Sequence, residues 1–142
     1  CLKTANELIT ERDIMNRYRS LRKADILLLR TGFYKYRGTC KYGSENPGIS
    51  PDAARFIRLH LGNIRCIGID SISVSPYQRR ELGRETHRIF FKKAFKNAPV
   101  RIIEDMDLSG RLSNLKQVYV FPLFIKDIDS SPCTILGILR DR

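Results

Sequence analysis

Residues 25–32 read Asp25-Ile26-Leu27-Leu28-Leu29-Arg30-Thr31-Gly32, a short and continuously apolar run that leads to a glycine. Such a run is typical of a β-strand that is buried on both faces. A second apolar run covers residues 64–69 and leads to Asp70. Between the two, Ser50-Pro51-Asp52 combines an N-cap residue, a proline at the first helical position and an early acid, and Gly62 ends the predicted helix. The sequence therefore predicts a strand–helix–strand unit with two parallel, neighbouring strands.

The residues that follow these two strands are candidates for contact with a ligand. They are Thr31 and Gly32 after the first strand, and Asp70 and Ser71 after the second. In open α/β sheets, ligands bind outside the carboxyl ends of the parallel strands. We therefore expect these four residues to face a ligand-binding crevice.

Two further segments lie before the helix. Thr10, followed by acidic residues, predicts the N-cap of a helix whose apolar residues recur at helical spacing as far as about Ser20. Residues 34–50 contain three glycines and a proline and show little periodicity. This composition predicts a long loop, and long loops in compact domains are often functional.

The C-terminal part of the chain predicts three more strands. Residues 100–104 read as a strand that ends in an acid, and residues 118–125 and 134–139 flank a turn-rich segment as the strands of a β-hairpin do. Pro122 lacks an amide hydrogen, so we expect it at an edge or a bulge. Asp127 and Asp129 lack the full spacing of a calcium loop and are interpreted as turn residues. Together with the first unit, these elements predict a mixed α/β fold.

The size and composition of the chain are those of one globular domain. A chain of 142 residues can bury a single core, and 42% hydrophobic with 29% charged residues excludes the disordered and fibrous classes. No apolar run approaches the roughly 20 residues that a membrane helix needs. We therefore expect one domain over residues 1–142 and no association with a membrane.

The four cysteines show no Cys-x-x-Cys pair and no spacing of a zinc or disulfide framework. This usage indicates a reducing, cytoplasmic setting. The sequence begins with Cys1 rather than methionine, so we expect further residues upstream of it. A lipidated N-terminal cysteine is the alternative, but residues 2–7 do not form the small, flexible tether of a lipoprotein.

The net charge of +11 raises the question of a nucleic-acid partner. Lys and Arg are densest between Arg79 and Arg101 and are interleaved with phenylalanines, as on a surface that binds phosphates and stacks on bases. The apolar residues of this segment also recur at helical spacing: Leu82, Thr86, Ile89, Phe90, Phe91 and Phe95. This spacing favours a helix with a core-facing apolar stripe and a solvated basic face, and makes nucleic acid the less favoured partner.

Few residues can carry hydrolytic chemistry. The two histidines are His60 and His87. His60 lies near the predicted end of a helix, where a cationic imidazole interacts favourably with the helix dipole, so we interpret it as a capping residue. His87 and Glu104 could supply two of the three or more ligands that a hydrolytic metal needs. Residue type alone equally allows a surface histidine and a glutamate that is solvated or paired with arginine.

Five short runs appear in the order in which a family of metal-dependent hydrolases carries them. They are Ala24-Asp25-Ile26-Leu27-Leu28-Leu29-Arg30-Thr31-Gly32, Asn46-Pro47-Gly48-Ile49-Ser50-Pro51-Asp52-Ala53-Ala54, Cys66-Ile67-Gly68-Ile69-Asp70, Thr86-His87-Arg88 and Arg101-Ile102-Ile103-Glu104-Asp105. On these runs, residues 25–140 resemble the C-terminal part of the cyclase or kynurenine-formamidase family. The resemblance implies that family's swivelling β/β/α fold, of which this chain would form the C-terminal two thirds.

The resemblance also implies a metal site. A histidine in a His-Arg segment and a glutamate that ends the next strand are metal ligands in the family, and His87 and Glu104 are the matching positions, although the segment between them is a few residues longer than usual. Zinc is the expected cation and manganese the alternative. Ser75 stands where relatives tend to have an aspartate before a proline, so that carboxylate is missing here.

The family's most diagnostic motif, His-x-Gly-Thr-His-x-Asp, supplies most of its metal ligands and has no counterpart in this sequence. Residues 1–7 contain neither histidine nor aspartate. We therefore expect the chain to be inactive by itself, unless upstream residues or a partner subunit complete the site.

The sequence thus predicts a cytoplasmic, metal-dependent hydrolase of amide or cyclic acyl bonds, similar to an arylformamidase. Its substrate would be a small-molecule amide, and the resemblance implies a homodimer or higher homo-oligomer. The alternative is a non-catalytic relative that keeps the fold and binds an anionic partner, such as nucleic acid, through its basic surface.

Overall fold

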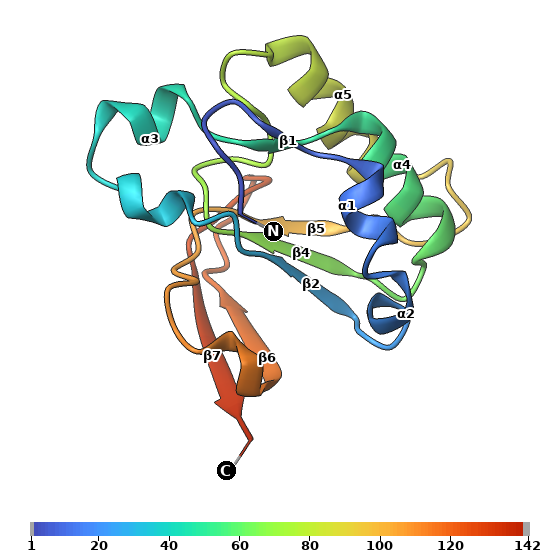
Figure 1. The fold of residues 1–142 in the computed structure, drawn as a ribbon. Coiled ribbons are helices and arrows are strands. Elements are labelled where there is room, and N and C mark those ends of the chain that lie inside the picture. Colours follow the sequence, from blue (N-terminus) through green and yellow to red (C-terminus); the bar gives the residue numbers. More distant parts are fainter. Residues whose placement is uncertain (1, 141–142) are drawn as a thin grey trace. The chain divides into compact units, whose positions relative to one another are not determined.

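The structure is a computed structural model that describes residues 2–140. The chain divides into two compact units, Cys1–Ser109 and Gly110–Arg142 (Figure 1). The single domain expected over residues 1–142 stays a prediction. The expectations about Cys1 lie outside the described residues.

The first unit is built around a three-stranded parallel sheet. Its strands are β2 (Ile26–Leu29), β4 (Cys66–Ile69) and β5 (Arg101–Ile103), in the order β2-β4-β5. The two apolar runs of the sequence are thus parallel neighbours, as predicted. The strand expected to end in an acid is β5, which is directly followed by Glu104.

Three helices pack on one face of this sheet (Figure 1). They are α1 (Glu11–Met15), α4 (Pro51–His60) and α5 (Arg80–Phe91). The N-cap of α4 is Ser50, whose hydroxyl accepts a hydrogen bond from the Ala53 amide at 3.1 Å. Ala54 and Ile57 of α4 and Leu61 after it are fully buried, as their helical spacing predicts.

The predicted helix after Thr10 is two short helices. Thr10 is the N-cap of α1 and forms a capping box with Asp13, which confirms the start. The helix then breaks, and α2 covers Tyr18–Leu21. Arg17 leaves the helical region, with φ −116° and ψ 8°, next to Asn16, a residue type of low helix propensity. The single helix to Ser20 is therefore wrong.

The loop predicted over residues 34–50 contains short regular elements. These are a 3-10 helix (Phe33–Tyr36), α3 (Cys40–Ser44) and β3 (Gly48–Ile49), which pairs in parallel with β1 (Leu8–Ile9). Elements this short show no hydrophobic periodicity, so the sequence did not predict them. A Cβ at Gly48 would lie 2.8 Å from the Val74 carbonyl oxygen, so glycine allows residues 74–76 to approach β3 closely.

The core-facing stripe of α5 is narrower than predicted. Thr86, Ile89 and Phe90 are buried, but Phe91 is 50% exposed at the end of the helix. Phe95 lies beyond the helix and is partly buried. The expectation for Phe91 is wrong because the buried stripe of α5 passes through Ile89 and Phe90 instead.

Buried Arg58 of α4 anchors the segment between α5 and β5. Its guanidinium donates to the carbonyl oxygens of Lys92 at 2.9 Å, Asn97 at 3.1 Å and Ala98. It also lies over the Phe95 ring, 4.8 Å from the ring centroid. The Arg58 side chain therefore supplies hydrogen-bond donors to three backbone carbonyl groups between α5 and β5.

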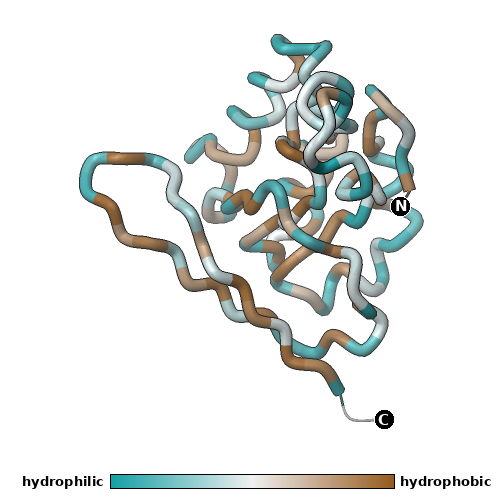
Figure 2. The backbone as a smooth tube through the Cα atoms, turned by 90° about the vertical axis from the view of Figure 1, so that its left-hand side faces the viewer, coloured by the Kyte–Doolittle hydropathy of each residue, from teal (hydrophilic) through white to brown (hydrophobic). Residues whose placement is uncertain are grey.

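The second unit is a β-hairpin, as predicted, but its first strand begins and ends three residues earlier than the expected residues 118–125. β6 (Leu115–Pro122) pairs antiparallel with β7 (Cys133–Leu139) after a short 3-10 helix (Leu112–Asn114). Pro122 is the last residue of β6, so its missing amide hydrogen does not interrupt the hydrogen bonds within the strand pair. Asp127 lies in a turn with φ 61°, in agreement with its interpretation as a turn residue. Both strands carry long hydrophobic stretches (Figure 2).

Within residues 2–140, none of the helices has the length and the apolarity that crossing a bilayer requires.

Candidate functional site

Asp70, which follows β4, is used by the fold rather than by a ligand. Its Oδ1 accepts hydrogen bonds from the Thr31 amide at 2.7 Å and the Thr31 hydroxyl at 2.6 Å, and its Oδ2 accepts one from the Gly32 amide at 2.8 Å. Thr31, Asp70 and Ser71 are buried. The expectation of a ligand-facing position is wrong for these three buried residues, and the Asp70 carboxylate instead satisfies the backbone donors of the turn after β2. Gly32 is only partly buried and lines a surface cavity with Arg30 and Tyr34.

His87 and Glu104, the metal ligands predicted from the sequence, lie side by side. His87 is on α5 and Glu104 follows β5. His87 Nε2 is 3.6 Å from Glu104 Oε1, and the side chains are 33% and 34% exposed. The pair lies together although the segment between the two residues is longer than the resemblance implies, and Arg58 anchors part of this segment.

Glu104 is held by the loop that follows β4. Its Oε1 accepts hydrogen bonds from the Val74 amide at 2.8 Å and from the Ser73 hydroxyl at 2.9 Å. Burial acts to raise the pKa of Glu104, but the contact with His87 and these hydrogen bonds outweigh burial and hold the pKa below its ordinary value of 4.5. The loop therefore keeps this carboxylate ionised and fixed in place.

The second nitrogen of the His87 imidazole is engaged by Ser75. Nδ1 lies 2.7 Å from Ser75 Oγ and 3.1 Å from the Gly83 carbonyl oxygen. A carbonyl only accepts, so these contacts assign the proton to Nδ1 and leave Nε2 facing Glu104. Glu104 raises the pKa of His87 above its ordinary value of 6.5, against the lowering effect of burial. A positive charge between Nε2 and Oε1, a proton or a metal ion, is thus favoured.

Two residues that sequence reasoning did not assign to the site bring Ser75 to His87. A Cβ at Gly83 would lie 2.5 Å from Ser75 Cβ and 2.6 Å from Ser75 Oγ, so only glycine leaves room for this approach. Buried Asn46 donates to the carbonyl oxygens of Ser73 at 3.1 Å and Ser75 at 2.8 Å. The available signals were a glycine four residues before His87 and the Asn-Pro-Gly run.

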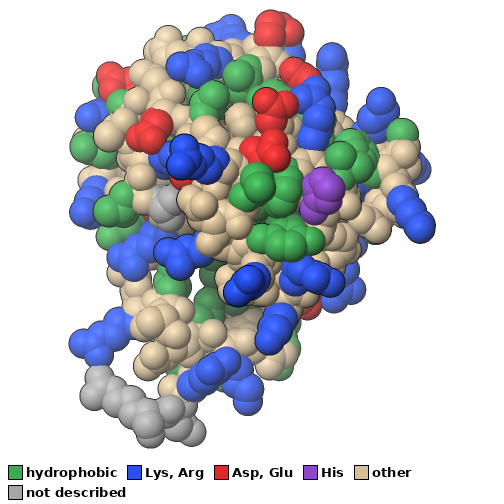
Figure 3. Space-filling view, turned by 45° about the vertical axis from the view of Figure 1, so that its right-hand side comes forward, with side chains coloured by type: hydrophobic (Ala, Val, Ile, Leu, Met, Phe, Trp, Pro, Cys, Tyr) green, Lys and Arg blue, Asp and Glu red, His purple; other side chains and the backbone are tan. Residues whose placement is uncertain are grey.

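Basic residues are spread over the surface. On the face drawn in Figure 3, Lys and Arg side chains stand at many separate places, with Asp and Glu side chains among them. Several arginines have acidic neighbours: Arg55 lies between Asp52 and Glu85, and Arg84 Nη1 is 2.8 Å from Glu81 Oε1. These pairs interrupt the basic face of α5 that the sequence predicts.

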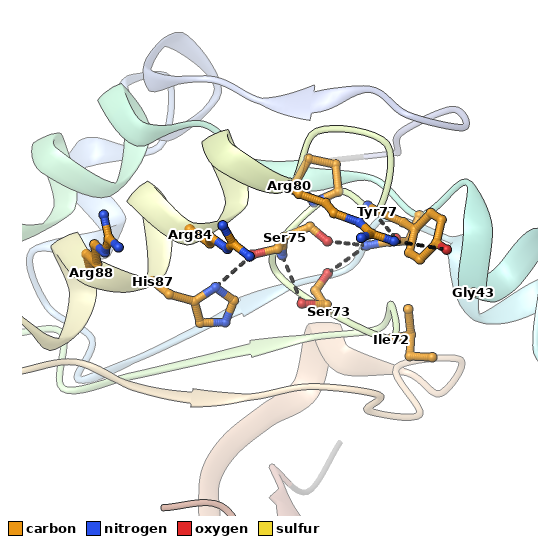
Figure 4. Close-up of a pocket in the computed structure, with 11 residues that line it drawn as sticks. Gly43, Ile72, Ser73, Ser75, Tyr77, Arg80, Arg84, His87 and Arg88 are labelled. Atoms are coloured by element: carbon orange, nitrogen blue, oxygen red, sulfur yellow. Dashed lines mark hydrogen bonds between the residues drawn. The ribbon is translucent and has the colours of Figure 1, made fainter.

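His87 opens into a cavity of about 730 Å³ beside α5 (Figure 4). A volume of this size suits a small organic molecule. The wall residues are Gly43, Asn46, Ile72, Ser73, Ser75, Pro76, Tyr77, Arg80, Arg84, His87 and Arg88. The candidate ligand pair therefore has a binding space next to it.

Residues 2–140 contain no group of three or more His, Cys, Asp and Glu side chains that could hold a metal ion. His87 and Glu104 are therefore not joined by a third such side chain within these residues. Two ligands at 2.0–2.1 Å from a tetrahedral zinc ion are about 3.4 Å apart, close to the separation found here. His60 is not part of the site: it is the last residue of α4, and its ring packs against Phe56 with centroids 4.8 Å apart.

The chain matches the model of a known protein family. The family model described as "Cyclase: Putative cyclase" matches residues 2–76, just over half of the chain. The match begins at residue 2, whereas the resemblance was expected to begin at residue 25. It includes Asn46, Ser73 and Ser75, and it ends before His87 and Glu104.

A curated protein and a solved structure are also similar. The protein "Uncharacterized protein MJ0783" of Methanocaldococcus jannaschii is 38% identical over 119 residues, which cover 81% of this chain and 54% of that protein. The chain therefore spans about half the length of this relative. Isatin hydrolase A from Labrenzia aggregata, bound to benzyl benzoate, matches with a TM-score of 0.69 and 19% identity, over 96% of this chain and 56% of that chain. This likeness in fold confirms the predicted mixed α/β class.

Proposed function

This chain belongs to the cyclase family, and on that premise we propose that it forms part of a metal-dependent hydrolase of amide or cyclic acyl bonds. The observation that supports this best is the pair His87 Nε2 and Glu104 Oε1, 3.6 Å apart beside a cavity. We propose that both residues bind one divalent cation, zinc first and manganese as the alternative, because imidazole and carboxylate suit both ions. When bound, such a cation acidifies a water molecule and polarises the carbonyl group of the substrate.

The surrounding residues act on the ligands rather than on the substrate. Ser75 holds the imidazole ring through Nδ1, so that Nε2 stays directed at Glu104. The Val74 amide and the Ser73 hydroxyl hold Glu104 Oε1. Ligand partners of this kind fix the ring orientation and the tautomer of a metal-binding histidine. In this chain the residue beside Nδ1 is a serine, at a position where the resemblance implies an aspartate.

The remaining ligands must come from outside residues 2–140, because no third His, Cys, Asp or Glu joins the pair within them. We propose that they belong to the rest of the protein or to a second copy of it in a homodimer. For the whole protein we therefore propose an activity class, the hydrolysis of amide or cyclic acyl bonds.

The cavity supports a small-molecule amide as the substrate. Ile72, Pro76 and Tyr77 line the cavity and provide apolar surface for an aryl group. Figure 4 shows Ile72 and Tyr77 at the end of the cavity away from His87. The structurally similar protein is named isatin hydrolase, which supports hydrolysis as the reaction class. We place the protein in the cytoplasm, in keeping with the free thiols of Cys40 and Cys133.

The test uses the protein expressed from its complete coding sequence and supplied with zinc. Formanilide, an aryl formamide, serves as the substrate, and released formate is measured. We expect His87→Ala and Glu104→Gln each to lower kcat/KM at least about 100-fold, because each removes a metal ligand. His60→Ala is the matched control, since His60 lies outside the site, and it should leave the rate unchanged. Full activity in both ligand variants would overturn the proposal.

A further inference from the structure

Asp105, the residue directly after Glu104, has a backbone conformation that residues with a Cβ atom rarely adopt. Its φ is 56°, in the left-handed region. Its amide donates to the Ser71 carbonyl oxygen at 2.8 Å, and the amide of Met106 donates to the Ile69 carbonyl oxygen at 2.9 Å. The chain therefore bends at Asp105, directly after the candidate metal ligand.

Two residues of the segment before β3 hold this bend. Arg37 Nε and Nη2 donate to Asp105 Oδ1 at 3.0 Å and 2.7 Å, and Nη2 also donates to the Asp105 carbonyl oxygen at 2.9 Å. The Tyr42 hydroxyl donates to the same Oδ1 at 2.5 Å. These contacts reach both the side chain and the backbone of Asp105. A strained backbone conformation persists where its surroundings fix it in this way, and such conformations cluster at functional sites.

The contacts of Asp105 are suited to fixing a local conformation. The Tyr42 ring is buried and stacks on the Phe33 ring, with centroids 6.1 Å apart, so the hydroxyl has a rigid support. The side chains of Arg37 and Asp105 are 40% and 56% exposed. An exposed ion pair adds little to the stability of a fold. The observations therefore favour a local role for the Asp105 carboxylate over a role in global stability.

The bend interrupts β5 at the point where Glu104 leaves the sheet. Successive side chains of a strand point to opposite faces of the sheet, so Ile102 and Glu104 share one face. Ile102 packs against the core, and Glu104 meets His87 of α5 on this face. The left-handed residue is the next one along the chain, so its conformation decides the direction in which the backbone of Glu104 continues.

We infer that Asp105 is a positioning residue, which Arg37 and Tyr42 hold so that the Glu104 carboxylate stays directed at His87. The inference rests on the proposed function, because it assigns to Asp105 an effect on a metal ligand. Asp105 itself touches neither the cation nor the substrate. Its loss should therefore weaken metal binding less than the loss of Glu104 does.

The experiment compares Asp105→Gly with Asp105→Asn in the protein expressed from its complete coding sequence. Glycine adopts a positive φ freely but has no side chain for Arg37 and Tyr42 to hold, whereas asparagine tolerates this φ and keeps an oxygen acceptor. Calorimetric titration measures the zinc affinity. We expect Asp105→Gly to lower it about tenfold, and Asp105→Asn to stay within about threefold of the original affinity.

Two further variants separate positioning from a loss of charge. Asp107→Gly removes the same charge two residues further on, where the carboxylate accepts from the Ser109 amide at 2.9 Å, and should leave the zinc affinity unchanged. In the Glu104→Gln background, Asp105→Gly should lower the zinc affinity no further, because a positioning residue acts through the ligand that it positions. Unchanged affinity in Asp105→Gly, or an equal loss with and without the Glu104 carboxylate, overturns the inference.

Crystal structures of the zinc-free protein give a readout that does not depend on metal binding. The Glu104 carboxylate should hold one position beside His87 Nε2 in the unsubstituted protein and in Asp105→Asn, and should leave it in Asp105→Gly. If zinc binds through His87 but the carboxylate keeps its position in Asp105→Gly, the inference fails and the proposed function stands. If no zinc binds at His87 while the carboxylate moves in Asp105→Gly, the proposed function fails and the positioning of Glu104 stands.

Discussion

Two acids follow neighbouring parallel strands in this fold, Asp70 after β4 and Glu104 after β5. Asp70 is fully buried, and its oxygens accept three hydrogen bonds from Thr31 and Gly32. Glu104 is about one third exposed and faces the imidazole of His87. Each acid is the residue directly after its strand, but the register pairs Gly68 with Ile103, so Glu104 is level with Ile69 and not with Asp70. Following a strand therefore does not by itself decide the role of an acid.

The difference comes from the donors around each acid. Two adjacent backbone amides need an acceptor where the chain turns after β2, and the left-handed conformation of Gly32, with φ 83°, aims its amide at Asp70. Around Glu104 the backbone and hydroxyl donors converge on Oε1, the atom that also faces His87. An acid in such surroundings remains able to bind a cation.

The largest effect should follow the loss of Asp70. Asp70→Ala leaves the buried amides of Thr31 and Gly32 without an acceptor and should lower the free energy of unfolding by about 3–5 kcal/mol. Urea denaturation measures this change. The control is Asp25→Ala, since Asp25 forms only an exposed pair with Arg65 at 3.5 Å, and that loss should stay below about 1 kcal/mol. Equal losses in the two variants would contradict the structural role of Asp70.

Glu104→Gln should leave the stability of the fold nearly unchanged but weaken zinc binding. The amide oxygen of glutamine can still accept from Val74 and Ser73, so the free energy of unfolding should change by less than about 1 kcal/mol. The zinc affinity should fall at least about 100-fold, because a charged ligand is lost. Calorimetric titration with zinc measures the affinity of the protein from its complete coding sequence. A stability loss as large as that of Asp70→Ala would show that Glu104 is also a structural acid.

A variant of Ser75 tests whether a hydrogen-bond partner of His87 also contributes to zinc binding. Ser75→Ala removes the hydroxyl at 2.7 Å from His87 Nδ1 and keeps the backbone. We expect the zinc affinity to fall about tenfold, because a partner of a ligand is lost and not a ligand. Ser75→Asp should restore or exceed the original affinity, and Ser44→Ala, whose hydroxyl bonds only within α3, is the matched control. Unchanged affinity in Ser75→Ala would remove Ser75 from the site.

The smallest expected effect is the pH dependence of the stability of the metal-free protein. The pKa of His87 is raised above 6.5, so its contribution to stability is fully present below 6.5 and is lost as the pH rises through the raised value. The pKa of Glu104 is lowered below 4.5, so its contribution is present above 4.5 and is lost as the pH falls through the lowered value. The pair therefore stabilises the fold most between about 4.5 and 6.5. In Glu104→Gln, NMR titration should show the His87 pKa moving down toward its ordinary value, and an unchanged His87 titration would contradict the pairing.

The strands that lead to the two acids, and the helix α4, could be predicted from the sequence. The apolar runs before Asp70 and Glu104 predicted both strands, and the cap at Ser50 predicted α4, because each signal is local. The roles of the two acids could not be predicted, because their donors come from distant turns. Thr31 is 39 residues from Asp70, and Val74 is 30 residues from Glu104.

Three further features of the fold and the site could not be predicted from local sequence signals. Ser75 was interpreted as a missing carboxylate, but its hydroxyl reaches His87 through space that Gly83 leaves open. The helix after Thr10 was expected to be continuous because its apolar residues recur regularly, and periodicity does not report a local break at Asn16 and Arg17. Spacing alone also could not show that Arg58 holds the long connection before β5.

The central claim is that His87 and Glu104 are ligands of one metal ion. The most direct measurement is an anomalous difference map at the zinc absorption edge, from crystals of the protein expressed from its complete coding sequence and grown with zinc. We predict a peak within about 2.0–2.2 Å of both His87 Nε2 and a Glu104 carboxylate oxygen, and its loss in His87→Ala. A zinc peak elsewhere, with His87 and Glu104 still paired to each other, would contradict the claim.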